Sequence, residues 1–131
     1  MADYVIDTHA CIFALAAPAK LGRRARQVLQ RADVERKCVF IPVAAAAEIV
    51  LLHELGRTDL GLPSLRAACE RSTFWRILPL DIEQVDEFAS LTSIRDPFDR
   101  LIVAAARRLR AKLVSRDAAI EESGLVETIW S

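Results

Sequence analysis

The sequence predicts an α/β fold, a three-layer α/β/α domain with a mostly parallel five-stranded sheet, and three observations lead to it. Five short apolar runs, several of them rich in β-branched residues, have the pattern of strands. Segments with helical spacing of apolar residues lie between most of them, and this alternation is typical of parallel sheets covered by helices. The chain of 131 residues has no repeat, low-complexity tract or linker-like stretch, so residues 1–131 are expected to form one domain.

The first half of the chain contains two of these strands. DYVID (3–7) predicts the first strand, followed by a turn and a helix from about residue 10 that ends before Pro18. Apolar residues at helical spacing predict a helix over 19–31, and CVFIP (38–42) predicts the second strand. VAAAAEIVLLHEL (43–55) is a strong helix former that ends at Gly56. Because it is almost entirely apolar, this helix is expected to be mostly buried.

The second half repeats the alternation. Pro63 opens a helix that continues through SLRAACERS (64–72), and RILPL (76–80) predicts the third strand. Asp81 is a suitable N-cap for a helix over 81–94, and Pro97 occupies the favoured first position of a helix over 96–111. KLVSRD (112–117) and LVETIW (125–130) predict the fourth and fifth strands.

Composition excludes several classes of protein. An apolar fraction of 53% argues against disorder, and no apolar run is long enough to cross a bilayer. The N-terminus has no basic leader before an apolar segment, so a soluble, cytoplasmic protein is expected. Three widely spaced cysteines, expected to be buried, and two histidines show no zinc-ligand spacing.

The net charge is zero, so the overall field does not attract a polyanion. Of the 18 basic residues 15 are arginine, and they gather in RRAR (23–26), in 31–37 and in RRLR (107–110). Such runs are either solvated helix faces or guanidinium groups that hold phosphates.

Acidic residues fall at positions that a parallel sheet brings together. Asp7 and Asp117 come at the ends of the first and fourth strands, and ligand sites in such sheets lie beyond the carboxyl ends of the strands. Asp96 and Asp99 stand at a helix start that the crossover connection returns to the same edge. Glu48 is an acid within an apolar helix, where a carboxylate needs a partner.

Two interpretations of these acids remain open from the residues alone. Asp96 as an N-cap and Asp99 in the first turn would suit a helix start, and Glu48 could lie on a narrow exposed stripe or pair with an arginine. Alternatively the acids share a pocket, where their mutual repulsion requires a cation. Oxygen-only ligands favour Mg²⁺ or Mn²⁺, which can activate water and stabilise the charge that develops on a cleaved phosphodiester.

Several stretches of the chain resemble a PIN-domain protein, most closely the VapC-type ribonuclease toxins of toxin–antitoxin pairs. They are VIDTH, the apolar helix with its central Glu48, DPFDRLIVAAA, and LVSRD followed by TIW. The resemblance covers nearly the whole chain. It implies a Mg²⁺- or Mn²⁺-dependent endoribonuclease with RNA as substrate, a protein antitoxin as partner and a homodimer as assembly. It implies that Asp7, Glu48, Asp99 and Asp117 are the catalytic metal-site acids, with Asp96 and Ser115 in supporting positions.

Arginines are candidates for RNA contact. Arg100 and Arg116 flank two of the acids, although adjacent residues diverge on a helix or strand, and RRAR offers Arg23, Arg24 and Arg26 as an outer track. Similar proteins often carry serine and tryptophan where this chain has Ala45 and Ala47. Two alternatives are a PIN-like module that binds without catalysis and a receiver-like Mg²⁺-binding signalling domain. The antitoxin is expected on apolar surface between Leu21 and Leu65.

Overall fold

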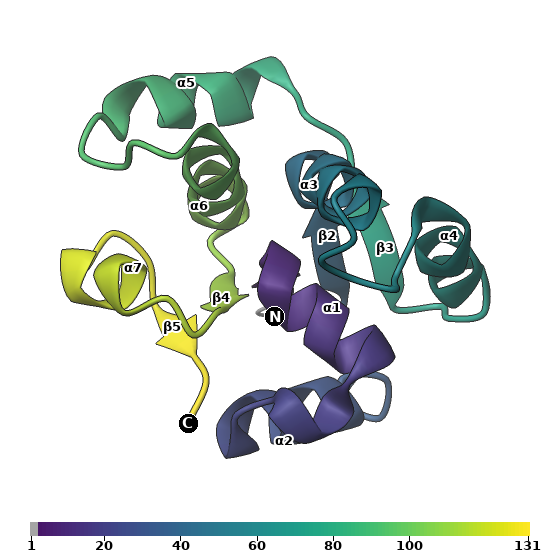
Figure 1. Ribbon diagram of the computed structural model, residues 1–131. Coiled ribbons are helices and arrows are strands. Elements are labelled where there is room, and N and C mark those ends of the chain that lie inside the picture. Colours follow the sequence, from purple (N-terminus) through teal and green to yellow (C-terminus); the bar gives the residue numbers. More distant parts are fainter. Residues whose placement is uncertain (1–2) are drawn as a thin grey trace.

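A computed structural model describes residues 3–131, which form one five-stranded sheet with helices packed around it (Figure 1). The strands are β1 (Tyr4–Ile6), β2 (Val39–Pro42), β3 (Trp75–Leu78), β4 (Lys112–Val114) and β5 (Thr128–Ile129). Their order in the sheet is β3-β2-β1-β4-β5, and all four pairings are parallel. The central strand β1 is fully buried, as expected for a parallel sheet covered on both faces.

The helices connect the strands by crossovers. They are α1 (Thr8–Ala16), the 3₁₀ turn η1 (Pro18–Lys20), α2 (Arg23–Arg31), α3 (Val43–Glu54), α4 (Leu62–Glu70), α5 (Ile82–Ser90), α6 (Pro97–Leu109) and α7 (Ala118–Ser123). In Figure 1, α5 and α6 lie at the top and α2 at the bottom, with strands between them. Helix α6 packs on β1, β2 and β4, and α5 covers α6 from outside. The predicted three-layer α/β/α fold is therefore confirmed.

Most predicted elements are present, with specific differences. The α1 helix begins at Thr8, directly after the strand, because Asp7 caps it. The 81–94 helix ends at Ser90, and β5 has two residues where six were expected. A short helix, α7, follows Asp117 and was not predicted. Of the three cysteines only Cys11 is buried, and Cys38 and Cys69 are half-buried.

The expectation that the alanine-rich helix is mostly buried was wrong. Only Ala45 and Ile49 of α3 are buried, and Leu51 is 46% exposed. Ala45 and Ile49 form one narrow buried stripe. Ala44, Ala46 and Leu52 are half-buried against the core, whereas Val43, Ala47 and Leu51 are exposed to solvent. Glu48 lies beside that stripe and is half-buried, so it is not an isolated charge in the core.

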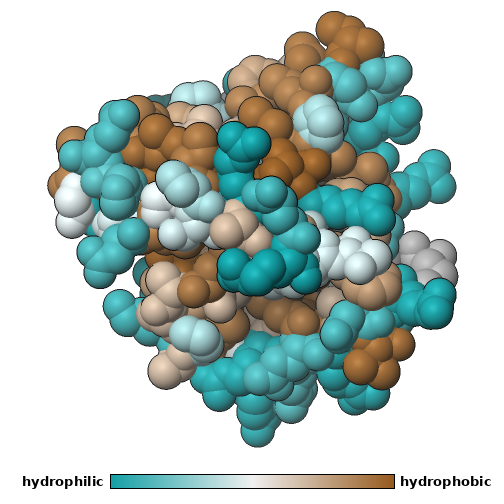
Figure 2. Space-filling view, turned by 90° about the vertical axis from the view of Figure 1, so that its right-hand side faces the viewer, coloured by the Kyte–Doolittle hydropathy of each residue, from teal (hydrophilic) through white to brown (hydrophobic). Residues whose placement is uncertain are grey.

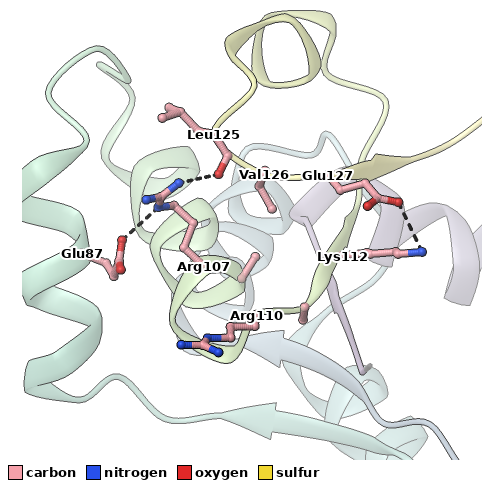
Figure 3. Close-up of a pocket in the computed structure, with 9 residues that line it drawn as sticks. Glu87, Arg107, Arg110, Lys112, Leu125, Val126 and Glu127 are labelled. Atoms are coloured by element: carbon pink, nitrogen blue, oxygen red, sulfur yellow. Dashed lines mark hydrogen bonds and ion pairs between the residues drawn. The ribbon is translucent and has the colours of Figure 1, made fainter. Parts of the chain in front are cut away.

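Arg107 joins three parts of the molecule at the edge of the sheet where the strands begin (Figure 3). Its Nε lies 2.9 Å from Oε2 of Glu87 on α5, and its Nη1 donates a hydrogen bond of 2.6 Å to the backbone carbonyl of Leu125. Nearby, Lys112 pairs with Glu127 at 3.2 Å. A surface pocket of about 390 Å³ lies among these groups, at the edge opposite the acids described below. The contacts of Arg107 fix the segment that precedes β5 against α6.

The topology decides against one alternative function. Receiver-like domains have the strand order 2-1-3-4-5, whereas this sheet has the order 3-2-1-4-5. Among residues 3–131, no helix has both the length and the apolar character needed to cross a membrane.

Candidate metal centre

Three acidic residues cap helices that begin at the carboxyl edge of the sheet. Oδ1 of Asp7 accepts from the N–H of Ala10, at 2.9 Å, and starts α1. Asp96 caps α6 by accepting from the N–H of Asp99, and Asp117 caps α7 by accepting from the N–H of Ile120, each at 3.0 Å. The cap role that the sequence suggested for Asp96 is thus present. Because a cap uses one carboxylate oxygen, capping leaves the other oxygen for a second partner.

Glu48 is held by a residue that sequence reasoning did not single out. Thr8 Oγ1 donates a hydrogen bond of 2.5 Å to Glu48 Oε1, which joins the start of α1 to the middle of α3. Thr8 itself is 2% exposed, so its hydroxyl has little access to water and the hydrogen bond fixes its direction. The partner of Glu48 is therefore the hydroxyl of Thr8 and not the arginine that the sequence left open.

The four predicted metal-site acids line one cleft of about 630 Å³. Its lining contains Asp7, Glu48, Asp96, Asp99 and Asp117 together with Thr8, His9, Arg116, Ala118 and Ala119. Asp99 lies in the first turn of α6 and is half-buried. The convergence of these acids, which the sequence suggested from their positions after strands and at helix starts, is therefore a feature of the structure.

Electrostatic repulsion in the cleft is strongest at Asp99. Partial burial raises the pKa of Asp99, and the neighbouring carboxylates of Asp96, Asp117, Glu48 and Asp7 raise it further, to about 7. Each of these four acids is therefore close enough to oppose a negative charge on Asp99. A cation bound among them would relieve that repulsion.

Asp7 lies deeper in the same site. Burial raises its pKa, while hydrogen bonds from Ser115 and from the backbone of Ala10 lower it, as does the nearby His9. Ser115 is 2% exposed, and its Oγ also accepts from the N–H of Asp117 at 3.1 Å. Ser115 therefore contacts two of the acids.

The donor set is compatible with a hard divalent cation but not with a closed protein cage. All candidate ligands are carboxylate oxygens, the kind that Mg²⁺ and Mn²⁺ prefer. Among residues 3–131, no three His, Cys, Asp or Glu side chains are close enough together to surround an ion by themselves. Magnesium usually keeps several waters and is held by one or two carboxylates together with substrate phosphate, and an open acidic cleft of this size suits that mode of binding.

The two alanines that depart from the family pattern are not among the residues that line the acidic cleft. Ala45 is fully buried in the core. Ala47 lines a different, apolar groove of about 230 Å³, with Val43, Leu80 and Leu101 among its neighbours. The hydroxyl that contacts the central glutamate comes instead from Thr8 on α1.

Two cationic side chains, Arg116 and Lys20, lie over the ring of Phe13 beside the cleft. The Arg116 guanidinium lies 4.9 Å from the ring centre of Phe13, and Lys20 Nζ lies 5.7 Å from it. Arg116 is exposed and lines the cleft, whereas Phe13 is buried. Trp130 packs beside Phe13, with ring centres 6.3 Å apart. Arg116 therefore places a positive charge beside the acids of the cleft.

The other arginines proposed for RNA contact differ from one another. Arg100 donates from Nε to the backbone carbonyl of Phe88 at 2.8 Å, and its guanidinium lies 4.2 Å from the centre of the Phe88 ring. The guanidinium therefore packs on the C-terminal end of α5. Arg26 contacts carbonyls around η1, at 3.3 Å for Pro18. Arg23 and Arg24 are exposed at the start of α2, where the N–H of Ala25 bonds to the Trp130 carbonyl.

Two residues of the site were missed from the sequence. Thr8 and His9 follow Asp7 directly, and both line the cleft because α1 begins there without an intervening turn. The signal was present in DTH, since an aspartate before a helix is a typical N-cap. Treating Asp7 as a cap would have placed Thr8 and His9 in the first helical turn, beside the acid.

Comparisons with known proteins identify the family and the fold. The PIN domain family model matches residues 4–124. No curated protein matches the chain. The solved VapBC2 of Rickettsia felis, bound to a DNA fragment from its promoter, is similar with a TM-score of 0.71 at 14% identity, over 98% of each chain.

Two further solved structures have the same fold. FitAcB from Neisseria gonorrhoeae has a TM-score of 0.64 at 20% identity, over 95% of each chain. VapC20 of Mycobacterium tuberculosis, a toxin that cleaves the sarcin–ricin loop, has a TM-score of 0.61 at 15% identity, over 97% of this chain and 99% of that one. The family model spans most of the sequence and the resemblance seen in its motifs is confirmed: the chain belongs to the PIN-domain family.

Proposed function

We propose that this protein is a Mg²⁺- or Mn²⁺-dependent endoribonuclease and the toxin of a toxin–antitoxin pair. The observation that carries the proposal is the convergence of Asp7, Glu48, Asp96, Asp99 and Asp117 on one cleft, which together with burial raises the pKa of Asp99. A fold has no need to gather like charges in this way, and a site for a cation does. The similarity to VapC20, which cleaves RNA, supports the choice of substrate.

In this proposal the residues of the cleft have different roles. Asp7, Glu48, Asp99 and Asp117 would hold the cation, directly or through water. Thr8 and Ser115 fix the directions of Glu48 and Asp7. When bound, the cation would activate a water molecule and stabilise the charge that develops on the cleaved phosphodiester. Arg116 contacts a neighbouring phosphate, and Asp96 caps α6 so that Asp99 keeps its position.

The test is cleavage of end-labelled RNA by the purified protein, with Mg²⁺, with Mn²⁺ and with EDTA. We expect cleavage only with a divalent cation and a loss of about a hundredfold or more in Asp99→Asn, in line with removal of a group that stabilises the transition state. Asp99→Asn keeps the size of the side chain, so its thermal stability should be unchanged or raised. Full activity in this variant would refute the metal-site role of Asp99, whereas no cleavage by the wild type with either cation would favour a PIN-like module that binds without catalysis.

The proposed protein partner is an antitoxin that covers apolar surface and offers a basic side chain to the cleft. Within 21–65 the exposed large apolar side chains are those of Val34, Val43, Leu51, Leu55 and Leu62. Figure 2 views the molecule from the side on which β3 and α4 lie, and apolar groups are exposed in the upper part of that face. The solved VapBC2 of R. felis supports the choice of partner. An antitoxin that leaves this surface and the cleft open would contradict the proposal.

We also propose that the toxin forms a homodimer. Further exposed large apolar residues are Leu80, Ile82 and Val85, and Leu80 lines the same apolar groove as Ala47. Covering them with a second copy would remove this surface from water, where exposed patches favour association. Analytical ultracentrifugation checks the assembly, and an Ile82→Glu variant should shift it toward monomer. A purely monomeric wild type at micromolar concentration would refute this part.

A further inference from the structure

The acidic cleft continues into a second cavity that the proposed reaction does not use. This cavity of about 490 Å³ shares Asp96, Asp99, Asp117 and Ala119 with the cleft. The rest of its lining comes from Ser93, Ile94, Arg95, Ile120, Ser123 and Leu125. We name it the second lobe. It lies between the loop that joins α5 to α6 on one side and α7 with the following loop on the other.

The walls of the second lobe are held in place by several hydrogen bonds. Ile120 is 5% exposed, and its N–H is bound by Asp117. The Leu125 carbonyl accepts from Arg107, as Figure 3 shows, and the Leu125 N–H donates to Ser123 Oγ at 3.2 Å. On the opposite wall, the N–H of Ile94 bonds to the Leu91 carbonyl at 3.0 Å. The lobe is therefore formed before any ligand arrives.

Its size and chemistry differ from those of the acidic cleft. Ligand cavities in proteins are commonly about 300–1,000 Å³, mostly apolar, with a few polar groups that orient the ligand. The second lobe fits this description: Ile94, Ile120 and Leu125 supply apolar surface, while Ser93, Arg95 and Asp96 offer polar groups at its rim. Its three carboxylates, Asp96, Asp99 and Asp117, are all shared with the cleft, and the residues that line the lobe alone add no further acid.

We infer that the second lobe binds the base of the nucleotide next to the cleaved phosphodiester, and so makes the nuclease selective for that base. The inference rests on the proposed function, because the lobe begins at Asp99 and Asp117, where the phosphate would lie. A base is flat and apolar on its faces, which suits the apolar walls, and its edge carries N–H groups and acceptors. Asp96 accepts from such N–H groups, and Ser93 and Arg95 donate to the acceptors.

The variant Ser93→Phe tests the inference by filling the lobe. Ser93 is exposed and lines only the second lobe among the cavities described here. Thr92→Phe is the matched control, because Thr92 is also exposed, lies beside Ser93 and lines neither the cleft nor the lobe. Both variants add the same ring to the same loop.

The first measurement is cleavage of a randomised single-stranded RNA pool, with the products sequenced. The wild type and Thr92→Phe should favour particular bases at one position beside the cut. Ser93→Phe should lose that preference, and its kcat/KM should fall by about tenfold or more, the usual effect of spoiling an apolar pocket. Equal rates and equal base preferences in the two phenylalanine variants would overturn the inference.

The second measurement does not depend on cleavage. A hexaribonucleotide with a 2-aminopurine base is titrated into Asp99→Asn, alone or combined with Ser93→Phe or Thr92→Phe. Emission of the base should change on binding, and Ser93→Phe should abolish that change. If base binding appears but the wild type cleaves no RNA, the proposed function fails and the lobe stands. If RNA is cleaved and the emission responds equally in both phenylalanine variants, the lobe fails and the function stands.

Discussion

Thr8 on α1 and Glu48 on α3, forty positions apart in sequence, are joined by a hydrogen bond of 2.5 Å from Thr8 Oγ1 to Glu48 Oε1. Thr8 is buried, and Glu48 lines the acidic cleft. The bond fixes one carboxylate oxygen of Glu48 and so determines which way the other oxygen points. Thr8 is a positioning residue for the proposed cation rather than a ligand.

Thr8→Val, which keeps the shape of the side chain and removes the hydroxyl, should therefore lower RNA cleavage. A hydrogen bond to a charged group contributes about 1.5–3 kcal/mol, which corresponds to about a tenfold to hundredfold loss. The half-saturating Mg²⁺ concentration should rise as well. Thr92→Val, at an exposed threonine outside the cleft, serves as control. Wild-type metal dependence in Thr8→Val would show that the bond is only structural.

The stability of the metal-free protein should depend on the ionisation of Asp99. Its pKa is raised from 3.8 to about 7 in the folded chain, so the folded state holds this proton where the unfolded state has lost it. The free energy of unfolding therefore falls as pH rises from about 4 to about 7. Thermal unfolding in EDTA across this range should show the decline.

Asp99→Asn is the control for this pH dependence, because asparagine does not titrate. The difference in Tm between the variant and the wild type should be small at pH 4 and should grow, in favour of the variant, toward pH 7. Mg²⁺ should reduce the difference by stabilising the ionised wild type. A Tm difference that is constant from pH 4 to pH 7 would mean that the carboxylates do not repel one another as the structure indicates.

Local patterns in the sequence were enough to place most of the acids. Asp7 and Asp117 stand between a strand and a helix, and Asp96 stands before Pro97, so strand ends and cap preferences locate all three at one edge of a parallel sheet. The alternation of strands and helices likewise predicted a five-stranded, mostly parallel sheet, and all of its pairings are parallel. These features depend on residues that are neighbours in the chain.

Features that depend on packing between distant elements could not be predicted in the same way. The Thr8–Glu48 contact requires α1 to pack against α3, and no local pattern encodes that distance. The exposure of α3 depends on which of its faces the neighbouring helices reach, not on its own hydrophobicity. Arg100 flanks Asp99 in sequence, yet its guanidinium bonds to the end of the neighbouring helix α5. The short helix α7 has too few residues for a periodic pattern.

Asp96 should contribute more to stability than to catalysis. Asp96→Ala removes the N-cap of α6 and should cost about 1 kcal/mol in the free energy of unfolding. Its loss of cleavage should be smaller than that of Asp99→Asn. Asp81→Ala is the matched control, because Asp81 makes the same cap contact at 2.9 Å on α5 and does not line the cleft. Chemical denaturation gives both costs. Complete loss of cleavage in Asp96→Ala at wild-type stability would assign Asp96 to the reaction itself.

Arg23 and Arg24 should add to RNA affinity without affecting the metal site. They are exposed at the start of α2, which contacts the Trp130 backbone, and Trp130 packs against the Phe13 ring that lies under Arg116. A strand that leaves the cleft past Arg116 would therefore pass this helix start. With a net charge of zero, affinity must come from such local groups, so it should be modest and sensitive to salt.

Replacing both arginines with glutamine should weaken RNA binding and flatten its salt dependence. Each lost contact with a single strand lowers the slope of log K against log salt by about 0.7, so the pair should lower it by about 1.4. Mg²⁺ affinity should not change. Arg66→Gln with Arg108→Gln removes the same charge from exposed positions on α4 and α6, and should leave the slope near its wild-type value. If the two double variants show equal slopes, the strand leaves the cleft over another face, and Arg23 and Arg24 belong to a solvated helix surface.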